Sequence, residues 1–327
     1  MRITCHHCPR ECCLAEEQRG YCFVRQNVGG TIRCTAYGRS TGLCVDPIEK
    51  KPLMHFFPGS RVLSLGTIGC NMGCLFCQNW QTSHAVDERH LRVNATPAEV
   101  AQLAVKEQCH SVAYTYNEPI TWAEYAIDIA NECRARSVRN IAVTSGYISA
   151  EDRPAFFQPM DAANIDLKGF SDLFYEKYCH AHLGPVLETI EWVAKETDCW
   201  LELTNLLVPR ANDDLETLRR MCDWIVERLG EEIPLHFSAF YPHHKLVDRP
   251  PTPWNSLKLA YDVAKQVGLQ YVYLGNVHAP AYEATWCTRC GQVVIGRDGY
   301  RITQNALRNG CCTFCGARIA GRFATAV

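Results

Sequence analysis

Three closely spaced cysteines follow directly on an apolar run in the first quarter of the chain. The run covers residues 62–68, and Cys70, Cys74 and Cys77 then form a C-x3-C-x2-C triplet inside G-C-N-M-G-C-L-F-C-Q-N-W. Three thiolates fit three corners of a 4Fe-4S cubane, and because the triplet has no fourth partner, one iron stays open for an outside ligand. A zinc site or unpaired core cysteines is the alternative, but no adjacent His or Cys completes a tetrahedral set. The triplet therefore predicts a cluster that performs chemistry at its open iron.

At these residues the chain resembles the radical S-adenosylmethionine (radical SAM) superfamily. Phe76 places an aromatic residue before the last cysteine, and Gln78 and Asn79 follow it. The resemblance implies that S-adenosylmethionine chelates the open iron and that Phe76 belongs to the cofactor-binding residues. It also implies that one electron from the reduced cluster yields methionine and a 5′-deoxyadenosyl radical, which takes a hydrogen atom from a substrate. The cofactors would carry this step while the protein positions them.

Further motifs extend the resemblance over nearly the whole chain. They are C-H-H-C-P-R-E-C near the N-terminus, V-R-Q-N, D-P-I-E-K-K-P-L, and F-P-G-S-R-V-L-S-L-G-T before the triplet. Together they resemble the radical SAM enzymes of the AmmeMemoRadiSam system, which are related to the activases of glycyl-radical enzymes such as pyruvate formate-lyase. The resemblance implies a fold, a chemistry and partner proteins of that system, and it leaves the substrate open.

The pattern of apolar residues predicts the architecture. Between residues 60 and 275, β-rich runs alternate with helical-period segments, as in consecutive βαβ units. We predict strands at residues 62–67, 111–116, 140–144, 162–167, 200–208, 235–240 and 270–274, and helices at residues 97–109, 121–137, 183–196, 213–229 and 253–267. Residues 31–45 have a hairpin-like pattern.

The predicted fold class is α/β, a partial (β/α)6 TIM-like radical SAM barrel with two additions. The additions are a cysteine-rich N-terminal segment and a C-terminal zinc-ribbon or rubredoxin-like knuckle. With 327 residues and 47% hydrophobic content, the chain is long enough for one such barrel. The predicted domains are residues 1–59, 60–280 and 281–327.

Charge and hydropathy limit the classes of partner. The 33 Lys and Arg residues stand against 35 Asp and Glu residues, so there is no general cationic field for nucleic acid, although a local basic groove stays open. No apolar run reaches the length of a membrane span, and residues 1–8 do not resemble a signal peptide. We expect a cytoplasmic protein without membrane association that receives electrons from a reductant such as ferredoxin or flavodoxin.

Polar residues stand at the carboxyl ends of the predicted strands, where barrel enzymes carry their chemistry. The second strand ends in Y-T-Y-N-E-P, and Asn117 and Glu118 resemble the activase G-G-E motif, which opposes the ammonium of the methionine moiety. A helix-capping carboxylate is the alternative for Glu118. The third strand ends in V-T-S-G-Y, so Thr144 and Ser145 place hydroxyls near the cofactor, although the activases have T-N-G here.

The later strands supply further candidate cofactor contacts. The fourth strand reads A-N-I-D-L-K-G-F, and Asp166 and Lys168, two residues apart, point to one side of it. Its D-L-K motif is shared with the activases, which implies that Lys168 holds the methionine carboxylate; a salt bridge at the barrel rim is the alternative. Thr204 on the fifth strand is a further candidate. The resemblance implies that His236 on the sixth strand reaches the ribose, and a satisfied core histidine is the alternative.

The 20 cysteines favour metal binding over disulfides, because the chain is long, has C-x2-C pairs and has no export signal. Single cysteines in predicted helices or strands are interpreted as core residues: Cys109, Cys133, Cys179, Cys199 and Cys222. Two other groups have the spacing of metal ligands.

The N-terminal group forms C-x2-C-x3-C-x9-C with Cys5, Cys8, Cys12 and Cys22. We predict zinc or an auxiliary iron-sulfur cluster there, with Cys13 as an alternative to Cys12. The C-terminal group forms two C-x2-C-G knuckles with Cys287, Cys290, Cys312 and Cys315. We predict structural zinc there, with mononuclear iron or an auxiliary cluster as the alternative, and Cys311 as an alternative to Cys312.

The combined prediction is a radical SAM enzyme that abstracts hydrogen from an unidentified substrate, with no catalytic residue assigned beyond the cluster. The substrate classes are a small molecule, a peptide, an RNA base or, in a glycyl-radical-enzyme activase, a glycine of a partner protein. A zinc-stapled, non-catalytic binding scaffold is the alternative from another class.

Overall fold

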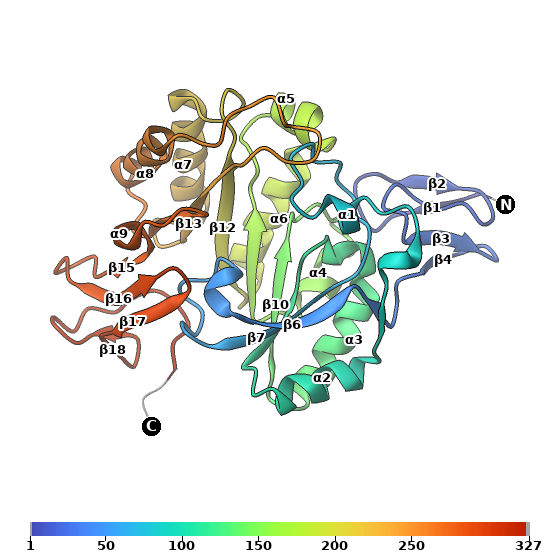
Figure 1. Cartoon of the computed structure of the whole chain (residues 1–327), viewed down its shortest axis with the longest axis horizontal. Helices are drawn as coiled ribbons and strands as arrows, with labels where there is room; N and C mark the ends of the chain where they lie inside the picture. The colour runs from blue at the N-terminus through green and yellow to red at the C-terminus, as the bar shows by residue number, and fades with distance from the viewer. Residues whose placement is uncertain (1, 325–327) are drawn as a thin grey trace.

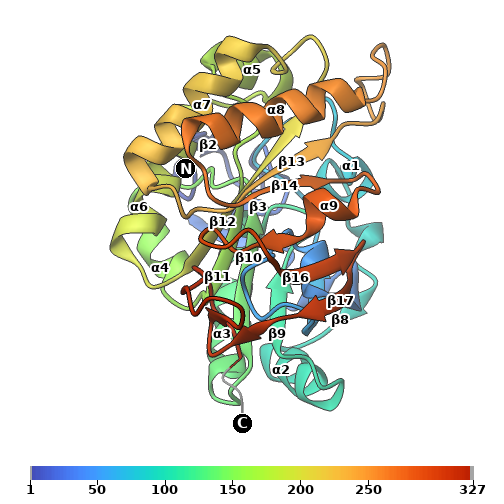
Figure 2. The same ribbon diagram turned by 90° about the vertical axis from the view of Figure 1, so that its left-hand side faces the viewer.

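One eight-stranded sheet forms the centre of the structure, a computed structural model that describes residues 2–324 (Figures 1 and 2). Its strands are β6 (Gly42–Pro47), β7 (Arg61–Gly66), β9 (Ser111–Tyr114), β10 (Arg139–Thr144), β11 (Ala162–Asp166), β12 (Trp200–Leu207), β13 (Leu235–Ala239) and β14 (Val272–Gly275). The order is β14-β13-β12-β11-β10-β9-β7-β6, with β6 antiparallel and the others parallel. Because β14 and β6 are the two edges and do not pair, the sheet is a partial barrel.

Helices between the strands cover the outer face of the sheet. They are α2 (Pro97–Lys106), α3 (Ala123–Arg134), α4 (Arg153–Phe157), α6 (Gly184–Glu196), α7 (Leu215–Leu229) and α8 (Trp254–Val267). Successive helices pack together, as α2 with α3 and α7 with α8, which Figure 2 shows. Thr96 and Asp214 cap α2 and α7 by accepting hydrogen bonds from backbone N–H groups of the first turn.

These elements confirm the predicted fold class, since all seven strands and five helices predicted in the barrel are present within a few residues of their expected ends. The short helix α4 was not predicted. The hairpin predicted over residues 31–45 is wrong: β3 (Arg25–Val28) pairs with β4 (Thr31–Cys34) across Gly29 and Gly30, and β6 joins the main sheet. The physical reason is burial, because Leu43 and Val45 of β6 pack against the main core.

Smaller elements lie at the two ends of the molecule (Figure 1). The N-terminal end holds β1 (Ile3–Cys5), β2 (Cys12–Leu14), β3 and β4, and β5 (Arg39–Ser40) pairs with β8 (Val93–Asn94). The C-terminal end holds α9 (Pro280–Glu283), β15 (Thr285–Trp286), β16 (Val293–Asp298), β17 (Arg301–Asn305), β18 (Leu307–Arg308) and β19 (Cys311–Cys312). Short helical turns complete the chain: η1 (Ile48–Lys50), α1 (Trp80–Ser83), η2 (Glu88–His90), η3 (Pro119–Trp122), α5 (Asp172–Phe174) and η4 (Tyr175–Cys179).

The predicted division into residues 1–59, 60–280 and 281–327 stays a prediction, and residues 1 and 325–327 lie outside the described residues. A search of the described residues finds no helix with the length and apolar character needed to cross a membrane.

Residues 48–57, here called the floor segment, close the amino-terminal end of the barrel. Ile48, Leu53 and Phe56 are buried in one cluster with four residues of the strands: Val62, Ala113, Ile141 and Ala162. This packing fills the barrel where the strands begin. The carboxyl ends of the strands are left to line a cavity.

Glu202 on β12 ties the floor segment to the sheet. Its fully buried carboxylate accepts hydrogen bonds from the backbone N–H groups of Met54, at 2.9 Å, and His55, at 2.8 Å. It also accepts from Trp200 Nε1, at 3.0 Å, and contacts His236 Nε2, at 2.7 Å. Burial alone would raise the pKa of Glu202, but the hydrogen bond and charge of His236 together with the other donors outweigh it and lower the pKa. Glu202 is therefore held ionised.

Replacing this carboxylate is expected to destabilise the whole fold. Glu202→Ala leaves buried N–H donors without partners, so we expect a loss of about 3–5 kcal/mol in the free energy of unfolding. Denaturant unfolding measures this. Glu191→Ala is the matched control, because Glu191 forms a solvent-screened surface ion pair with Lys195, and it should change stability far less than Glu202→Ala does. Similar losses in both variants would contradict the account.

Candidate active site

A single cavity of about 760 Å³ opens among the strand ends. It is lined by the three cysteines of the triplet and by every residue predicted to bind the cofactor: Phe76, Asn117, Glu118, Thr144, Ser145, Asp166, Lys168, Thr204 and His236. These residues come from β10, β11, β12 and β13 and from the loops after β7, β9, β10 and β11. Parallel strands explain the convergence, because their carboxyl ends meet at the same edge of the sheet. Their individual roles stay predictions.

The loop that carries the cysteines is fixed by Asn117. Its Nδ2 donates to the carbonyl oxygens of Ile68, at 2.9 Å, and Gly69, at 2.8 Å, and its Oδ1 accepts from Thr67 N at 2.9 Å. Gly69 has a φ of +87°, and a Cβ there would collide with the carbonyl of Cys22, so the close approach requires glycine. Asn117 thus holds the loop in place as well as lining the cavity.

The three cysteines fit the ligand set that an iron-sulfur cluster needs. Cys70, Cys74 and Cys77 all reach the cavity, although Cys74 is otherwise buried. No fourth cysteine is found among the described residues that line this cavity. The donor set therefore suits a cluster with three protein thiolates and one open position.

Cys179 is a neighbour of the triplet that the sequence did not reveal. A hydrogen bond with Cys179 lowers the pKa of Cys74, outweighing the effect of burial. The carbonyl of Cys179 also accepts from Gly73 N at 2.8 Å. Its interpretation as a plain core residue is incomplete, because η4 brings it against the cysteine loop from about 100 residues further along the chain. Periodicity within its own helix could not have indicated this contact.

Glu118 forms a buried, hydrogen-bonded carboxyl centre in the cavity. Its carboxylate accepts from Ser145 N at 2.8 Å, from the hydroxyls of Thr144 and Ser145, and from Ile120 N at 3.2 Å. Burial raises the pKa of Glu118, and the hydrogen bonds from Ser145 and Thr144 partly offset this. The Ile120 contact also bears out the capping alternative, since Glu118 precedes η3. A cationic group placed beside Glu118 would favour the ionised form.

Asp166 and Lys168 form an ion pair at the end of β11, with Nζ and Oδ2 2.8 Å apart. Burial opposes the charge of Lys168, but Asp166 and the nearby cysteines outweigh it and raise the pKa of the amine. An ammonium has three donors, so Lys168 can bind an anionic ligand group without losing Asp166. The pair is thus compatible with both sequence interpretations, the salt bridge and the cofactor contact.

Thr204 and His236 lie deeper in the cavity. The Thr204 hydroxyl donates to Asn164 Oδ1 at 2.9 Å, and His236 is held by Glu202 as described above. Because an ionised carboxylate only accepts hydrogen bonds, the Glu202 contact places a proton on His236 Nε2. In the neutral ring Nδ1 is then an acceptor.

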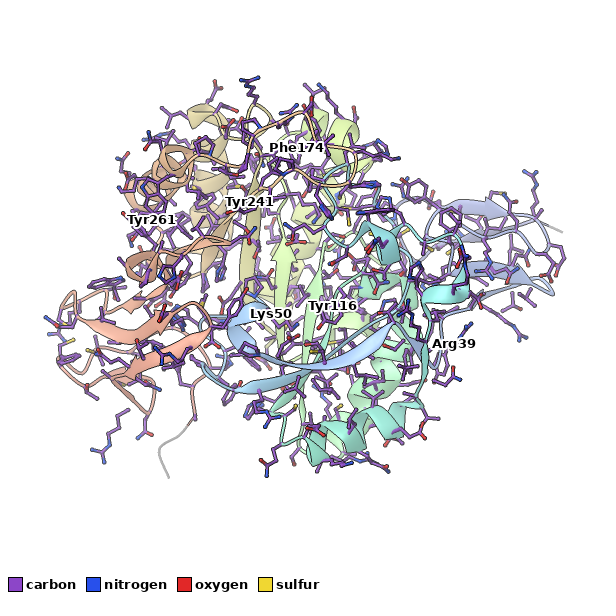
Figure 3. All side chains as sticks on the ribbon, in the orientation of Figure 1. Arg39, Lys50, Tyr116, Phe174, Tyr241 and Tyr261 are labelled. Carbon is purple, nitrogen blue, oxygen red and sulfur yellow. The ribbon has the colours of Figure 1, made fainter. Side chains whose placement is uncertain are left out.

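Lys50 and Tyr116 are cavity residues that sequence reasoning missed (Figure 3). Tyr116 follows β9 with a φ of +70°, a conformation that bulky residues rarely adopt. The Tyr116 hydroxyl and Lys50 Nζ each lie 2.8 Å from an oxygen of the Asp46 carboxylate, which also binds the buried Lys51. The sequence signal for these contacts was the motif D-P-I-E-K-K-P-L, which we interpreted only as part of the family resemblance.

The C-terminal cysteines have the geometry of a site for one metal ion. Cys287 Sγ lies 3.6 Å from Cys315 Sγ, and Cys290 Sγ lies 3.7 Å from Cys312 Sγ. A tetrahedral zinc ion with bonds of about 2.3 Å requires sulfur separations of about 3.8 Å. Gly291 and Gly316 have positive φ values of 67° and 74° and turn the two knuckles. Cys311 lies outside the tetrad, so the geometry favours Cys312 over Cys311 as the candidate ligand.

The C-terminal end also contributes to the main cavity. Glu283 of α9 and Tyr300, at the tip of the β16–β17 hairpin, are among its lining residues. Buried Arg297 joins the two regions by donating to the carbonyls of Glu283, at 3.0 Å, and Met54, at 2.7 Å. No local pattern in the sequence indicates this contact, because it spans more than 240 residues.

Comparisons with known proteins agree with this geometry. The sequence profile described as Radical SAM superfamily matches residues 65–223. Uncharacterized protein MJ0808 of Methanocaldococcus jannaschii is 41% identical over 320 residues, which cover 97% of this chain and 95% of that protein.

Solved structures show the same fold at low sequence identity. A radical SAM methyltransferase from Sphaerobacter thermophilus has a TM-score of 0.53 at 14% identity and covers 67% of each chain. SuiB of Streptococcus suis, bound to S-adenosylmethionine, has a TM-score of 0.50 at 11% identity and covers 71% of this chain and 53% of that one. These likenesses bear on the fold alone.

The geometry of the C-terminal tetrad predicts that metal binding depends on Cys312 and not on its neighbour Cys311. Cys312→Ser removes one of four thiolates, so elemental analysis should show about one metal ion fewer per chain than in the wild type. Cys311→Ser should keep the wild-type metal content, because Cys311 lies outside the tetrad. Equal metal loss in the two variants would contradict the assignment of Cys312.

Proposed function

We propose that this chain, whose residues 65–223 match the radical SAM superfamily profile, cleaves S-adenosylmethionine reductively at a 4Fe-4S cluster on Cys70, Cys74 and Cys77 and abstracts hydrogen from a substrate. The observation that supports this most strongly is the convergence of the cysteine triplet and all nine predicted cofactor residues on one cavity. When bound, the cluster and S-adenosylmethionine supply a one-electron cleavage of the sulfonium.

The cavity residues offer complementary charges for the methionine moiety. Glu118 presents a carboxylate for the ammonium, and Thr144 and Ser145 hold that carboxylate in position. Lys168 presents an ammonium for the methionine carboxylate. Because both groups are buried, each ionic contact is stronger than it would be in water. The pair therefore orients the cofactor in one direction along the cavity.

His236 is suited to a hydroxyl of the ribose. Glu202 fixes the ring orientation through Nε2, so Nδ1 is the ring nitrogen left to contact the hydroxyl. Phe76, packed against Phe174 with ring centroids 6.2 Å apart, adds an apolar wall beside the cysteines. Such a wall excludes water from the region where hydrogen would be abstracted.

The substrate is proposed to contact Lys50, Tyr116 and Tyr300, three of the lining residues to which no cofactor contact is assigned. The proposed electron donor is a ferredoxin or flavodoxin, and the proposed partners are other proteins of the AmmeMemoRadiSam system. This assignment follows from the sequence motifs of the first 67 residues.

The reaction is tested on anaerobically reconstituted protein with dithionite and S-adenosylmethionine. We expect 5′-deoxyadenosine and methionine as products, and we expect Cys70→Ala, Cys74→Ala and Cys77→Ala combined to reduce 5′-deoxyadenosine to the level of a protein-free blank. Cys44→Ala is the control, because Cys44 is exposed and lies outside the cavity. Product formation by the triple variant at the wild-type rate would refute the proposal.

The substrate class is tested by isotope transfer. Deuterium moves from the true substrate into 5′-deoxyadenosine, so labelled small molecules, peptides, RNA and partner proteins of the system can be compared in parallel. A protein that contains zinc but no cubane absorbance would support the non-catalytic scaffold instead.

A further inference from the structure

Four N-terminal cysteines line a second, smaller cavity that is separate from the active-site cavity. These cysteines are Cys5, Cys8, Cys12 and Cys22, here called the N-terminal set. The antiparallel pairing of β1 with β2 places Cys5 opposite Cys12, so the two side chains share one face of the ribbon. Cys13 follows on the other face and is exposed. The structure therefore selects Cys12 over Cys13 as the fourth member.

The sulfurs of the N-terminal set are spaced too widely for one metal ion. Among residues 2–324, the C-terminal tetrad is the one group of three or more metal-ligating side chains whose ligand atoms all lie within 4.8 Å of one another. No three sulfurs of the N-terminal set are that close, and the same holds for the triplet of Cys70, Cys74 and Cys77. A single zinc ion needs separations of about 3.8 Å. A cubane places four irons between its thiolates, so its cysteine sulfurs must lie farther apart than those around a single ion.

A buried guanidinium in the same cavity points to an anionic occupant. Arg25 is 2% exposed and lines this cavity, and its Nη1 pairs with Glu124. Its Nε and Nη2 have no hydrogen-bond partner. Buried donors without partners are costly, and a charged donor more so. A cluster carried by four thiolates is anionic, and its inorganic sulfides add acceptors that a zinc ion lacks.

The N-terminal cavity borders the loop of the central triplet. Asn71, directly after Cys70, lines the N-terminal cavity, and Arg10 donates to the carbonyl of Asn71. A Cβ on Gly73 would collide with the hydroxyl of Tyr21, which is the neighbour of Cys22. The two sets of cysteines are thus in direct contact through their loops.

We propose that Cys5, Cys8, Cys12 and Cys22 bind a second 4Fe-4S cluster, in place of the zinc that their spacing in the sequence equally allows. With four cysteine ligands this cluster has no open iron and does not respond to S-adenosylmethionine. The inference is independent of the proposed function, because it concerns other ligands.

The test uses the full-length protein and the variant with Cys70→Ala, Cys74→Ala and Cys77→Ala, both reconstituted with iron and sulfide without oxygen. We expect about eight iron atoms per chain in the wild type and about four in the triple variant, with matching sulfide. After reduction, the triple variant should show one cubane signal in electron paramagnetic resonance that S-adenosylmethionine leaves unchanged. A triple variant with no iron and additional zinc would overturn the proposal.

A second variant, in the N-terminal set, distinguishes loss of one cluster from misfolding of the whole protein. Cys8→Ala combined with Cys22→Ala should also retain about four iron atoms, and its signal should respond to S-adenosylmethionine. Cys13→Ala, the matched control, should keep about eight, and a loss of four iron atoms from it would contradict the choice of Cys12 over Cys13. If instead the proposed function is wrong and the triplet binds no cluster, the variants of the N-terminal set should contain no cubane at all.

Discussion

The side-chain amide of Asn117 is the interaction on which the site depends. Asn117 lies in the loop after β9 and holds three consecutive residues of the loop after β7. The two strands are parallel neighbours, so the fold itself brings their carboxyl ends together. The amide then fixes the loop so that three cysteines face one cavity, which is the preorganisation that a cluster with an open position requires. Glu118, the next residue, places its carboxyl group in the same cavity.

The floor segment connects this site to the C-terminal end of the chain. Met54 donates through its N–H to Glu202 and accepts through its carbonyl from Arg297. Glu202 orients His236 in the cavity, whereas Arg297 belongs to β16 beside the metal tetrad. Residues of the C-terminal end therefore help to form and support the cavity. Tyr300, on the same C-terminal end as the cysteine tetrad, is one of the residues that line the cavity.

Much of the fold could be predicted because the barrel strands are apolar runs bounded by polar residues, and local pattern determines such elements. Much of the cavity lining followed from one topological rule, since Thr144 and Asp166 stand at the carboxyl ends of parallel strands, whereas His236 lies deeper, near the start of β13. The roles of Glu202 and Arg297 could not be predicted, because their partners lie about 150 and 240 residues away. The placement of β6 was missed for the same reason, since its pairing with β7 competes with a local hairpin. Tyr116 was overlooked because its positive φ has no signal in the sequence.

The central claim is that an iron of the cluster on the triplet is open and binds the amino and carboxylate groups of S-adenosylmethionine. Electron-nuclear double resonance on the reduced protein, with the cofactor isotopically labelled at its amino nitrogen, measures this binding directly. The account predicts a hyperfine coupling between the label and the cluster that disappears when Cys70, Cys74 and Cys77 are replaced. A reduced cluster on these cysteines without coupling to the bound, labelled cofactor would contradict it.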